Sequence, residues 1–374
     1  MPISENFVNS TTNPRKSKKN SEDKIKRIAY YISAHGYGHA ARSIPVLRQL
    51  IPSHSVFIKS AIDCDFFNKH LPNNFEFISQ NVDAGCQHSN SLKIDSEKSF
   101  QALKSFFKNS SLTHEKNWLS NNKIDLIISD VASMPLKVAS QLKLPSILIG
   151  NFTWHDIYSH LPQTKNESIL IQSLAEEYSH ATVQILPQCH LNNKIIDNKK
   201  EVGFITNKGK NIRDDLEHHL GKGAENKTLV FIYLGEHGTH SVAWENLGEI
   251  KDCLFLTRDP IDHPAVNTLN EIFTYQDLIA SSDIILTKGG YSTLSTAFAN
   301  HKPVITCERN DFYEFEAIRE YLQIREIGIL IKDKQFCHGD WQEHIKEALK
   351  LTVKNKVPLN GEIEISKIIH QMLS

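Results

Sequence analysis

The sequence predicts an α/β protein made of two Rossmann-like domains that face a cleft. Short runs rich in Ile, Val and Leu alternate with helical segments, which is typical of parallel sheets covered by helices on both faces. This alternation stops in a polar stretch at about 202–227 and then restarts. A chain of 374 residues is also too long for one ordinary hydrophobic core, so two domains are expected.

Each strand predicted in the first half is a short apolar run followed by a helical pattern or a polar break. Strands are expected at 27–33, 55–60, 75–79, 124–130, 145–151 and 183–187. Helices are expected at 41–51, 65–71, 99–120, 134–143 and 167–181, with a polar insertion at about 81–98.

The second half repeats this pattern. Strands are expected at 228–235, 253–258, 283–288, 303–309 and 327–331, and helices at 240–250, 274–282, 291–301, 312–323, 341–353 and 362–374. The expected boundaries are a disordered tail (1–26), an N-terminal domain (27–205), a C-terminal domain (206–345) and a C-terminal helical segment (346–374).

The composition argues against several classes of protein. Lys and Arg number 42 against 43 Asp and Glu, and a net charge of −1 argues against a nucleic-acid partner. No window reaches the roughly 18 apolar residues of a transmembrane helix, and the N-terminus lacks the apolar core of a secretory signal. The six scattered cysteines favour a reducing, cytoplasmic location. The basic cluster at 15–19 is expected to belong to the disordered tail, with a peripheral contact to an acidic membrane surface as the alternative.

Ligands of such sheets bind at the carboxyl ends of strands, which makes four strand ends the candidate site. The first is "SAHGYGHAARS" at 33–43, where Gly36 and Gly38 allow a tight turn and a close backbone approach. His35 and His39 are candidate bases, because the positive end of the following helix favours a neutral imidazole. The motif is neither GxGxxG nor a Walker loop, and with no third ligand nearby it is not a metal site. The alternative is a glycine turn with incidental histidines.

Two other strand ends carry weaker signals. Asp130 ends a buried strand, from which a carboxylate can orient a histidine on a neighbouring strand end; the alternative is a cap on the next helix. "YLGEHGTH" at 233–240 places Gly235 and Gly238 after a strand, either framing phosphates or forming a plain loop.

The strongest signal lies at 283–318. A strand ends in Lys288, Gly289 and Gly290, and a helix opens with Tyr291, Ser292 and Thr293. Free backbone N–H groups and hydroxyls at a helix start make an anion site. The next strand end carries the acids Glu308, Asp311, Glu314 and Glu316. An anion site one strand away from carboxylates suits a ligand with phosphates at one end and hydroxyls at the other. A nucleotide sugar is such a ligand. The alternative is a helix cap at Ser292 beside a solvated acidic loop.

These motifs resemble those of GT-B glycosyltransferases. The segment 283–318 resembles their diphosphate-binding GG-x-S/T helix, and the first motif resembles the GGH or GHxxP turn of the lipid II-forming N-acetylglucosaminyltransferase and the plant-type enzymes. A closer likeness is to the glycosyltransferase-like N-terminal part of arabinokinases, through "AHGYGHAAR", "ISD", "NFTWHDIY" and "KGGYSTLSTA", over about 27–330. Their kinase part has no counterpart in this sequence, so sugar phosphorylation is not implied.

The resemblance implies a metal-independent hexosyl- or pentosyltransferase whose only co-substrate is a nucleotide sugar, UDP-linked by default. His39 would take the proton of a hydroxyl acceptor, Asp130 would orient His39, and His35 is a second candidate base. The N-terminal domain would hold the acceptor through Gly38, Arg42, Trp154 and His155, with core packing as the alternative for Trp154. The C-terminal domain would hold the donor through Gly235, Phe273, Tyr275, Lys288, Gly289, Gly290, Tyr291, Ser292, Thr293, Glu314 and Glu316.

Two departures from the family pattern keep alternatives open. Thr296 stands where the family usually has a glutamate, and "NDFYEFE" replaces the usual acid–glutamine pair, so Glu314 and Glu316 are expected to serve instead. The alternatives are a nucleotide-sugar 2-epimerase, which shares the fold, and a non-catalytic nucleotide-sugar-binding protein. No motif identifies the acceptor.

Overall fold

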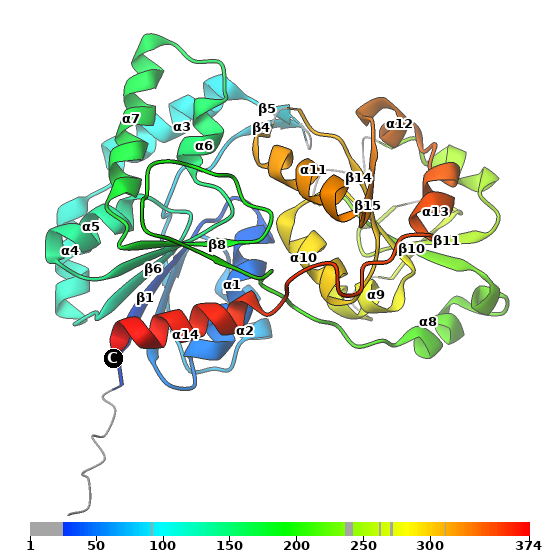
Figure 1. Ribbon diagram of the computed structural model, residues 1–374, viewed down its shortest axis with the longest axis horizontal. Coiled ribbons are helices and arrows are strands. Elements are labelled where there is room, and N and C mark those ends of the chain that lie inside the picture. The colour runs from blue at the N-terminus through cyan, green and yellow to red at the C-terminus, as the bar shows by residue number, and fades with distance from the viewer. Residues whose placement is uncertain (1–24, 91–92, 236–241, 262, 270–271, 311) are drawn as a thin grey trace, which may run out of the picture.

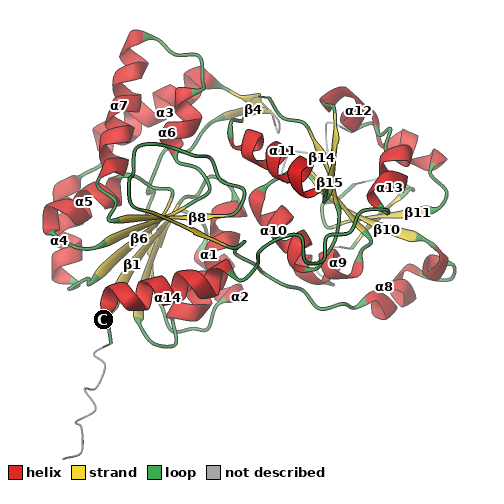
Figure 2. Cartoon of the chain, in the orientation of Figure 1, coloured by secondary structure: helices red, strands yellow, loops and turns green. Residues whose placement is uncertain are grey.

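The protein contains two parallel β-sheets flanked by helices, as the computed structural model shows (Figures 1 and 2). The structure describes residues 25–90, 93–235, 242–261, 263–269, 272–310 and 312–374. The two predicted α/β units are therefore confirmed. Three features named from the sequence lie outside the described residues, namely the basic cluster at 15–19, the segment "EHGTH" with Gly238, and Asp311 of the acidic loop.

The first sheet has the strand order β3-β2-β1-β6-β7-β8-β9, all parallel. Its strands are β1 (Arg27–Ile32), β2 (Ser55–Ser60), β3 (Glu76–Ser79), β6 (Leu126–Asp130), β7 (Ser146–Ile149), β8 (Val183–Pro187) and β9 (Lys199–Val202). The helices that connect them are α1 (Tyr37–Leu50), α2 (Cys64–His70), α3 (Ser96–Asn109), α4 (Leu112–Asn121), α5 (Met134–Leu142), α6 (Trp154–Ser159) and α7 (Lys165–Ser179).

The second sheet has the order β12-β11-β10-β13-β14-β15 and is also parallel. Its strands are β10 (Thr228–Tyr233), β11 (Cys253–Thr257), β12 (Val266–Thr268), β13 (Ile284–Thr287), β14 (Val304–Cys307) and β15 (Gly328–Ile331). Its helices are α8 (Arg213–Leu220), α9 (Tyr275–Ser281), α10 (Tyr291–Ala299), α11 (Glu314–Arg325), α12 (Asp333–His338) and α13 (Gln342–Ala348).

In both sheets the chain begins at a central strand, moves to one edge and then returns to continue on the other side. The strand order therefore reverses between β1 and β6 in the first sheet and between β10 and β13 in the second. Ligands of doubly wound sheets bind at such switch points, beyond the carboxyl ends of the strands. The turns after β1, β6, β10 and β13 are thus the places to look for a site.

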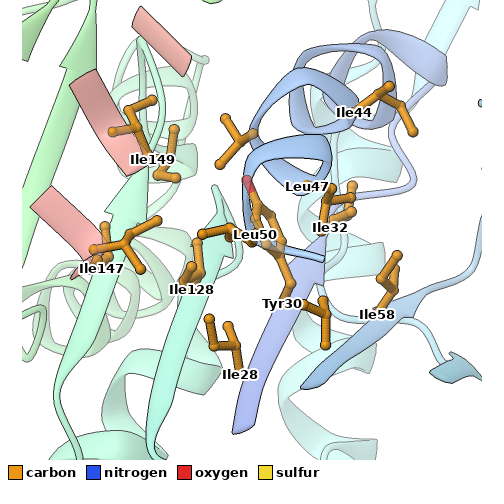
Figure 3. Packing of buried hydrophobic residues seen from close by; sticks show 14 of the residues in the cluster. Ile28, Tyr30, Ile32, Ile44, Leu47, Leu50, Ile58, Ile128, Ile147 and Ile149 are labelled. Atoms are coloured by element: carbon orange, nitrogen blue, oxygen red, sulfur yellow. The ribbon is translucent and has the colours of Figure 1, made fainter. Parts of the chain in front are cut away.

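Strand β1 is held rigidly because both of its faces are buried. Ile28 and Ile32 share one core with Ile128 of β6 and with Leu47 and Leu50 of α1 (Figure 3). The alternate side chains of β1 point to the opposite face and join a second core. The turn that follows β1 consequently starts from a fixed point.

Several short elements differ from the sequence predictions. The polar insertion at 81–98 contains a small hairpin, β4 (His88–Asn90) and β5 (Lys93–Ile94). Strand β9 is polar because it lies at the edge of its sheet, so it lacks the apolar run that marks a buried strand. The helix expected at 240–250 is a 3₁₀ helix at Trp244–Glu249, and the start of that range lies outside the described residues.

The last helix, α14 (Gly361–Leu373), returns to the first domain. Its residues Ile365, Ile369 and Leu373 belong to the same core as β1 and α1. Figure 1 shows α14 lying along the first domain after the chain has left the second. No helix in the described ranges is both long and apolar enough to cross a membrane.

The two connections between the domains lie against each other. The Phe204 N–H donates to the Pro358 carbonyl oxygen at 2.9 Å, and the Gly361 N–H donates to the Phe204 carbonyl oxygen at 2.9 Å. The backbones come so close that a Cβ at Gly203 would overlap Leu359, and a Cβ at Gly361 would overlap the Gly203 carbonyl group. Glycine is required here because only its backbone leaves room for the crossing.

Replacing Gly361 by alanine is expected to lower the free energy of unfolding by about 1–3 kcal/mol, because the added methyl group forces the two connections apart. Urea denaturation followed by circular dichroism measures this change. Gly248→Ala is the matched control, since a Cβ there meets no atom within 4 Å. Equal stability of the two variants would contradict the close crossing.

Candidate active site

The turn after β1 places His39 next to Asp130 at the end of β6. Gly36 begins this turn with a φ of 72°, a left-handed conformation, and forms the N-cap of α1. His39 lies in the first turn of α1, and its Nδ1 is 2.8 Å from Asp130 Oδ1. Strands β1 and β6 are hydrogen-bonded neighbours, so their ends bring the two side chains together.

The tautomer of His39 follows from its partner. The Asp130 carboxylate only accepts hydrogen bonds, so Nδ1 of His39 carries the proton and donates it to Oδ1. Nη2 of Arg42 lies 3.1 Å from the same nitrogen, but both atoms are then donors and this contact is no hydrogen bond. In the neutral form of the ring, Nε2 is then the nitrogen without a proton, which is the arrangement that a general base requires.

Arg42 and Ser43 complete the set of donors around Asp130. Arg42 donates through Nη2 to Oδ1 at 2.5 Å and through Nε to Oδ2 at 3.0 Å, and the Ser43 hydroxyl donates to Oδ2 at 3.0 Å. Burial would raise the pKa of Asp130, but the Arg42 charge and the hydrogen bonds from His39 and Arg42 hold it at about 2. Asp130 is therefore charged at neutral pH although it has no solvent exposure.

His35 lies beside this pair in a more aromatic environment. Its Nε2 is 3.2 Å from Nε2 of His88, and its ring meets the edge of Trp154 with the ring centres 5.0 Å apart. Burial, together with the positive charges of neighbouring groups, lowers the pKa of His35 to about 3. His35 is thus a neutral side chain at physiological pH. A Cβ at Gly85 would collide with its ring, so a glycine is needed where the loop after β3 packs against it.

Trp154 is buried between the two histidines. Its ring centre is 6.1 Å from that of His39, and its Nε1–H donates to Asp83 Oδ2 at 2.7 Å. Asp83 also accepts a hydrogen bond from the Ser33 hydroxyl at 3.1 Å. The next residue, His155, is half-buried, and burial lowers its pKa.

Across the interface, α10 begins directly after β13 with the sequence "GGYST". Gly289 has a φ of 80°, and a Cβ there would collide with Thr306 and Phe315. Gly290 is the N-cap residue of α10. Because glycine has no side chain, the N-cap accepts no hydrogen bond through a side chain from the first N–H groups of the helix. The Ser292 hydroxyl donates to the carbonyl oxygen of Gly38 at 2.7 Å. The first turns of α1 and α10 therefore meet.

Other residues predicted on the donor side pack inside the second domain. The Tyr275 hydroxyl donates to Thr293 Oγ1 at 2.7 Å, and the Tyr291 hydroxyl accepts the Ile205 N–H at 3.2 Å. Phe273 packs against the core of the same domain. The structure thus brings Tyr275 against Thr293, whereas Tyr291 contacts the connection that leaves the first domain.

Lys288 and Gly235 lie against each other at the ends of β13 and β10. A Cβ at Gly235 would approach Nζ of Lys288 to 2.7 Å, so the glycine leaves space for the amine. This places a positive charge beside the switch point of the second sheet.

The two acids of α11 differ in their surroundings. Glu314 Oε1 accepts a hydrogen bond from Asn151 Nδ2 of the first domain at 2.7 Å. Glu316 is exposed and pairs with Arg319 on its own helix. Thr296, at the position of the family's glutamate, is buried and donates back to the Ser292 carbonyl oxygen at 2.8 Å.

Asp83, His88 and Asn151 are site residues that the sequence analysis does not single out. Asn151 lies at the end of a predicted strand and inside a quoted motif, so its position was a usable signal. Asp83 and His88 lie in the polar insertion, where no periodic pattern indicates what they face. Within the described ranges, no three His, Cys, Asp or Glu side chains are grouped as metal ligands would be.

Comparison with solved structures identifies the architecture. The chain superposes on the glycotransferase of kitacinnamycin with a TM-score of 0.68 at 14% identity, covering 94% of this chain and all of that one. It superposes on a UDP-glucosyltransferase from Polygonum tinctorium with a TM-score of 0.63 at 11% identity, over 95% and 100% of the two chains. For the glycosyltransferase SnogD from Streptomyces nogalater the TM-score is 0.60 at 14% identity, over 94% and 100%. The chain has the GT-B fold, as predicted.

Among curated proteins, the chain is similar to the L-arabinokinase of Arabidopsis thaliana. The two are 23% identical over 344 residues, which cover 89% of this chain and 33% of the relative. The chain thus spans about a third of the length of the curated relative that it matches. No protein-family model matches the chain.

Asp130→Asn is expected to lower the free energy of unfolding by about 3 kcal/mol at pH 7, because Arg42 then remains buried without a counter-charge. The folded-state pKa of Asp130 lies below its unfolded value, so its contribution is complete above about pH 4 and is lost as the pH falls toward 2. The difference from the wild type should shrink over that range. Urea titrations at several pH values measure it, with the exposed Asp215→Asn as the control.

Proposed function

We propose that the protein transfers a sugar from a nucleoside diphosphate sugar, UDP-linked by default, to a hydroxyl group of an acceptor. The observation that carries this proposal is the meeting of α1 and α10, where Ser292 contacts Gly38. A candidate base and a candidate anion site thereby face the same space between the domains. The similarity of the fold to UDP-sugar-dependent glycosyltransferases supports this assignment.

In the proposed reaction, the acceptor oxygen attacks the anomeric carbon while the bond from that carbon to the β-phosphate oxygen breaks. His39 receives the acceptor proton at Nε2, and Asp130 stabilises the imidazolium that forms, through the Nδ1–H hydrogen bond. His35, Trp154, His155 and Gly38 are proposed to face the acceptor. The neutral state of His35 suits a hydrogen bond to a hydroxyl, because burial keeps its pKa low.

The diphosphate gains negative charge as it leaves. The first N–H groups of α10, after Gly289 and Gly290, together with Lys288, are proposed to stabilise this charge. The Ser292 hydroxyl is proposed to join them by turning its one proton from the Gly38 carbonyl oxygen to the diphosphate when the donor binds. A helix end and a lysine supply the positive potential that many other transferases take from a bound metal, so the proposed reaction is metal-independent. Phe273 and Tyr275 are proposed to border the nucleobase, and Glu314 and Glu316 to border the donor sugar. A hexose and a pentose both fit this proposal.

His39→Ala should lower kcat by about 10²–10⁴-fold and leave donor affinity nearly unchanged, since only the proton acceptor is removed. Nucleotide sugars are first screened by thermal shift, and turnover is then followed by mass spectrometry with a panel of hydroxyl acceptors. His114→Ala, on the exposed surface of α4, is the control. Wild-type turnover in His39→Ala would refute the base assignment. An epimerised donor without acceptor, or tight binding without any turnover, would favour the epimerase or the non-catalytic alternative.

Ser292→Ala should weaken UDP binding by about 5–10-fold, because one hydroxyl contact to the diphosphate is lost. Titration calorimetry with UDP and with uridine separates this contact from the nucleoside contacts. The affinity for uridine should not change. An equal loss for both ligands would place Ser292 away from the phosphates.

A further inference from the structure

A chain of hydrogen bonds runs from the second domain to the candidate base. Glu314 of α11 accepts from Asn151 Nδ2 at 2.7 Å, and Asn151 Oδ1 accepts from Arg42 Nη1 at 2.5 Å. Arg42 then binds Asp130, which holds His39. Asn151 and Asp130 have no solvent exposure, and Arg42 and His39 are at most 7% exposed.

Asparagine suits its place in this chain for a chemical reason. The Arg42 guanidinium only donates hydrogen bonds, and the Glu314 carboxylate only accepts them. A side chain between the two must accept on one side and donate on the other, as a carboxamide does. This requirement also fixes the orientation of the Asn151 amide, with Oδ1 toward Arg42 and Nδ2 toward Glu314.

Arg42 touches the second domain by a separate route. Its guanidinium carbon lies 5.3 Å from the ring centre of Tyr291, the first residue of α10. Arg42 is therefore held by Asp130 and Asn151 from its own domain and by Tyr291 from the other. Separation of the two domains would remove Tyr291 from Arg42 and Glu314 from Asn151.

We propose that Asn151 and Arg42 are positioning residues that couple the contact between α11 and the first domain to the orientation and basicity of His39. His39 has its full orientation and basicity only while Glu314 contacts Asn151. This inference rests on the proposed function in one respect, since it takes His39 as the base. It adds that the base responds to contact between the domains.

The sign of the coupling follows from the charges. Burial would lower the pKa of Arg42, but the charge of Asp130 and, to a smaller extent, that of Glu314 raise it. The negative charge of Glu314 partly compensates the positive charge of Arg42. The negative charge of Asp130 then stabilises the protonated form of His39 more strongly. His35 after β1 and Asp83 in the loop after β3 also interact electrostatically with His39. Neither residue belongs to the chain of hydrogen bonds, so the electrostatic effect of both on His39 should be the same in all the variants.

Nuclear magnetic resonance of histidine-¹⁵N-labelled protein tests the coupling without any turnover. The signals of His39 are assigned by comparison with His39→Gln. In the wild type, Nδ1 should carry the proton of the neutral ring. Glu314→Gln keeps an acceptor for Asn151 and removes only the charge, so the titration midpoint of His39 should fall by roughly half a pH unit.

Two further variants separate charge from geometry. Asn151→Ala breaks the chain, and should lower the midpoint and weaken the preference for the Nδ1–H tautomer. The effects of Asn151→Ala and Glu314→Gln should not add in the double variant, because both act through Arg42. Glu320→Gln, an exposed carboxylate on the same helix, is the control and should leave the midpoint unchanged.

A midpoint in Glu314→Gln that is unchanged or higher would overturn the inference. Additive effects in the double variant would also overturn it. Turnover measurements on the same proteins keep the two proposals apart. If the wild type turns over a nucleotide sugar but Glu314→Gln leaves the His39 midpoint unchanged, only this inference is refuted. If Glu314→Gln lowers the midpoint but the wild type turns over no nucleotide sugar, only the proposed function is refuted.

Discussion

One buried charge determines much of this structure. Asp130 is cut off from water, and a buried carboxylate must be compensated by donors. All three of its side-chain donors, His39, Arg42 and Ser43, come from α1. The position of α1 against β6, the tautomer of His39 and the shape of the glycine turn are therefore parts of one arrangement. The apolar contacts between α1 and the sheet stabilise that arrangement without specifying it (Figure 3).

Much of the fold was predictable because parallel strands buried on both faces leave a clear apolar pattern. The approach of His39 to Asp130 was predictable from the same pattern, since both residues follow or end strands of one sheet. What the pattern does not contain is the packing between the domains. Nothing local to Asn151 indicates that Glu314, 163 residues away, is its partner. The polar edge strand β9 was missed because a strand that is mostly exposed has no run of apolar residues.

The surroundings of Arg42 could not be read from its motif. Arg42 was predicted on the acceptor side, and the structure shows its guanidinium bound to Asp130 and Asn151 among buried side chains. The structure brings Trp154 against both histidines and ties it to Asp83. In that position the side chain belongs to a buried core and at the same time packs against the two candidate bases.

The return of α14 has a consequence for how the chain folds. The first domain takes part of its core from residues 365–373, which are synthesised after the whole second domain. A chain emerging from the ribosome can assemble β10 to β15 while the first core still lacks its last helix. Contacts between α1 and α14 span more than 300 residues, and such long-range contacts form slowly. Completion of the first core is therefore expected after synthesis of the second domain.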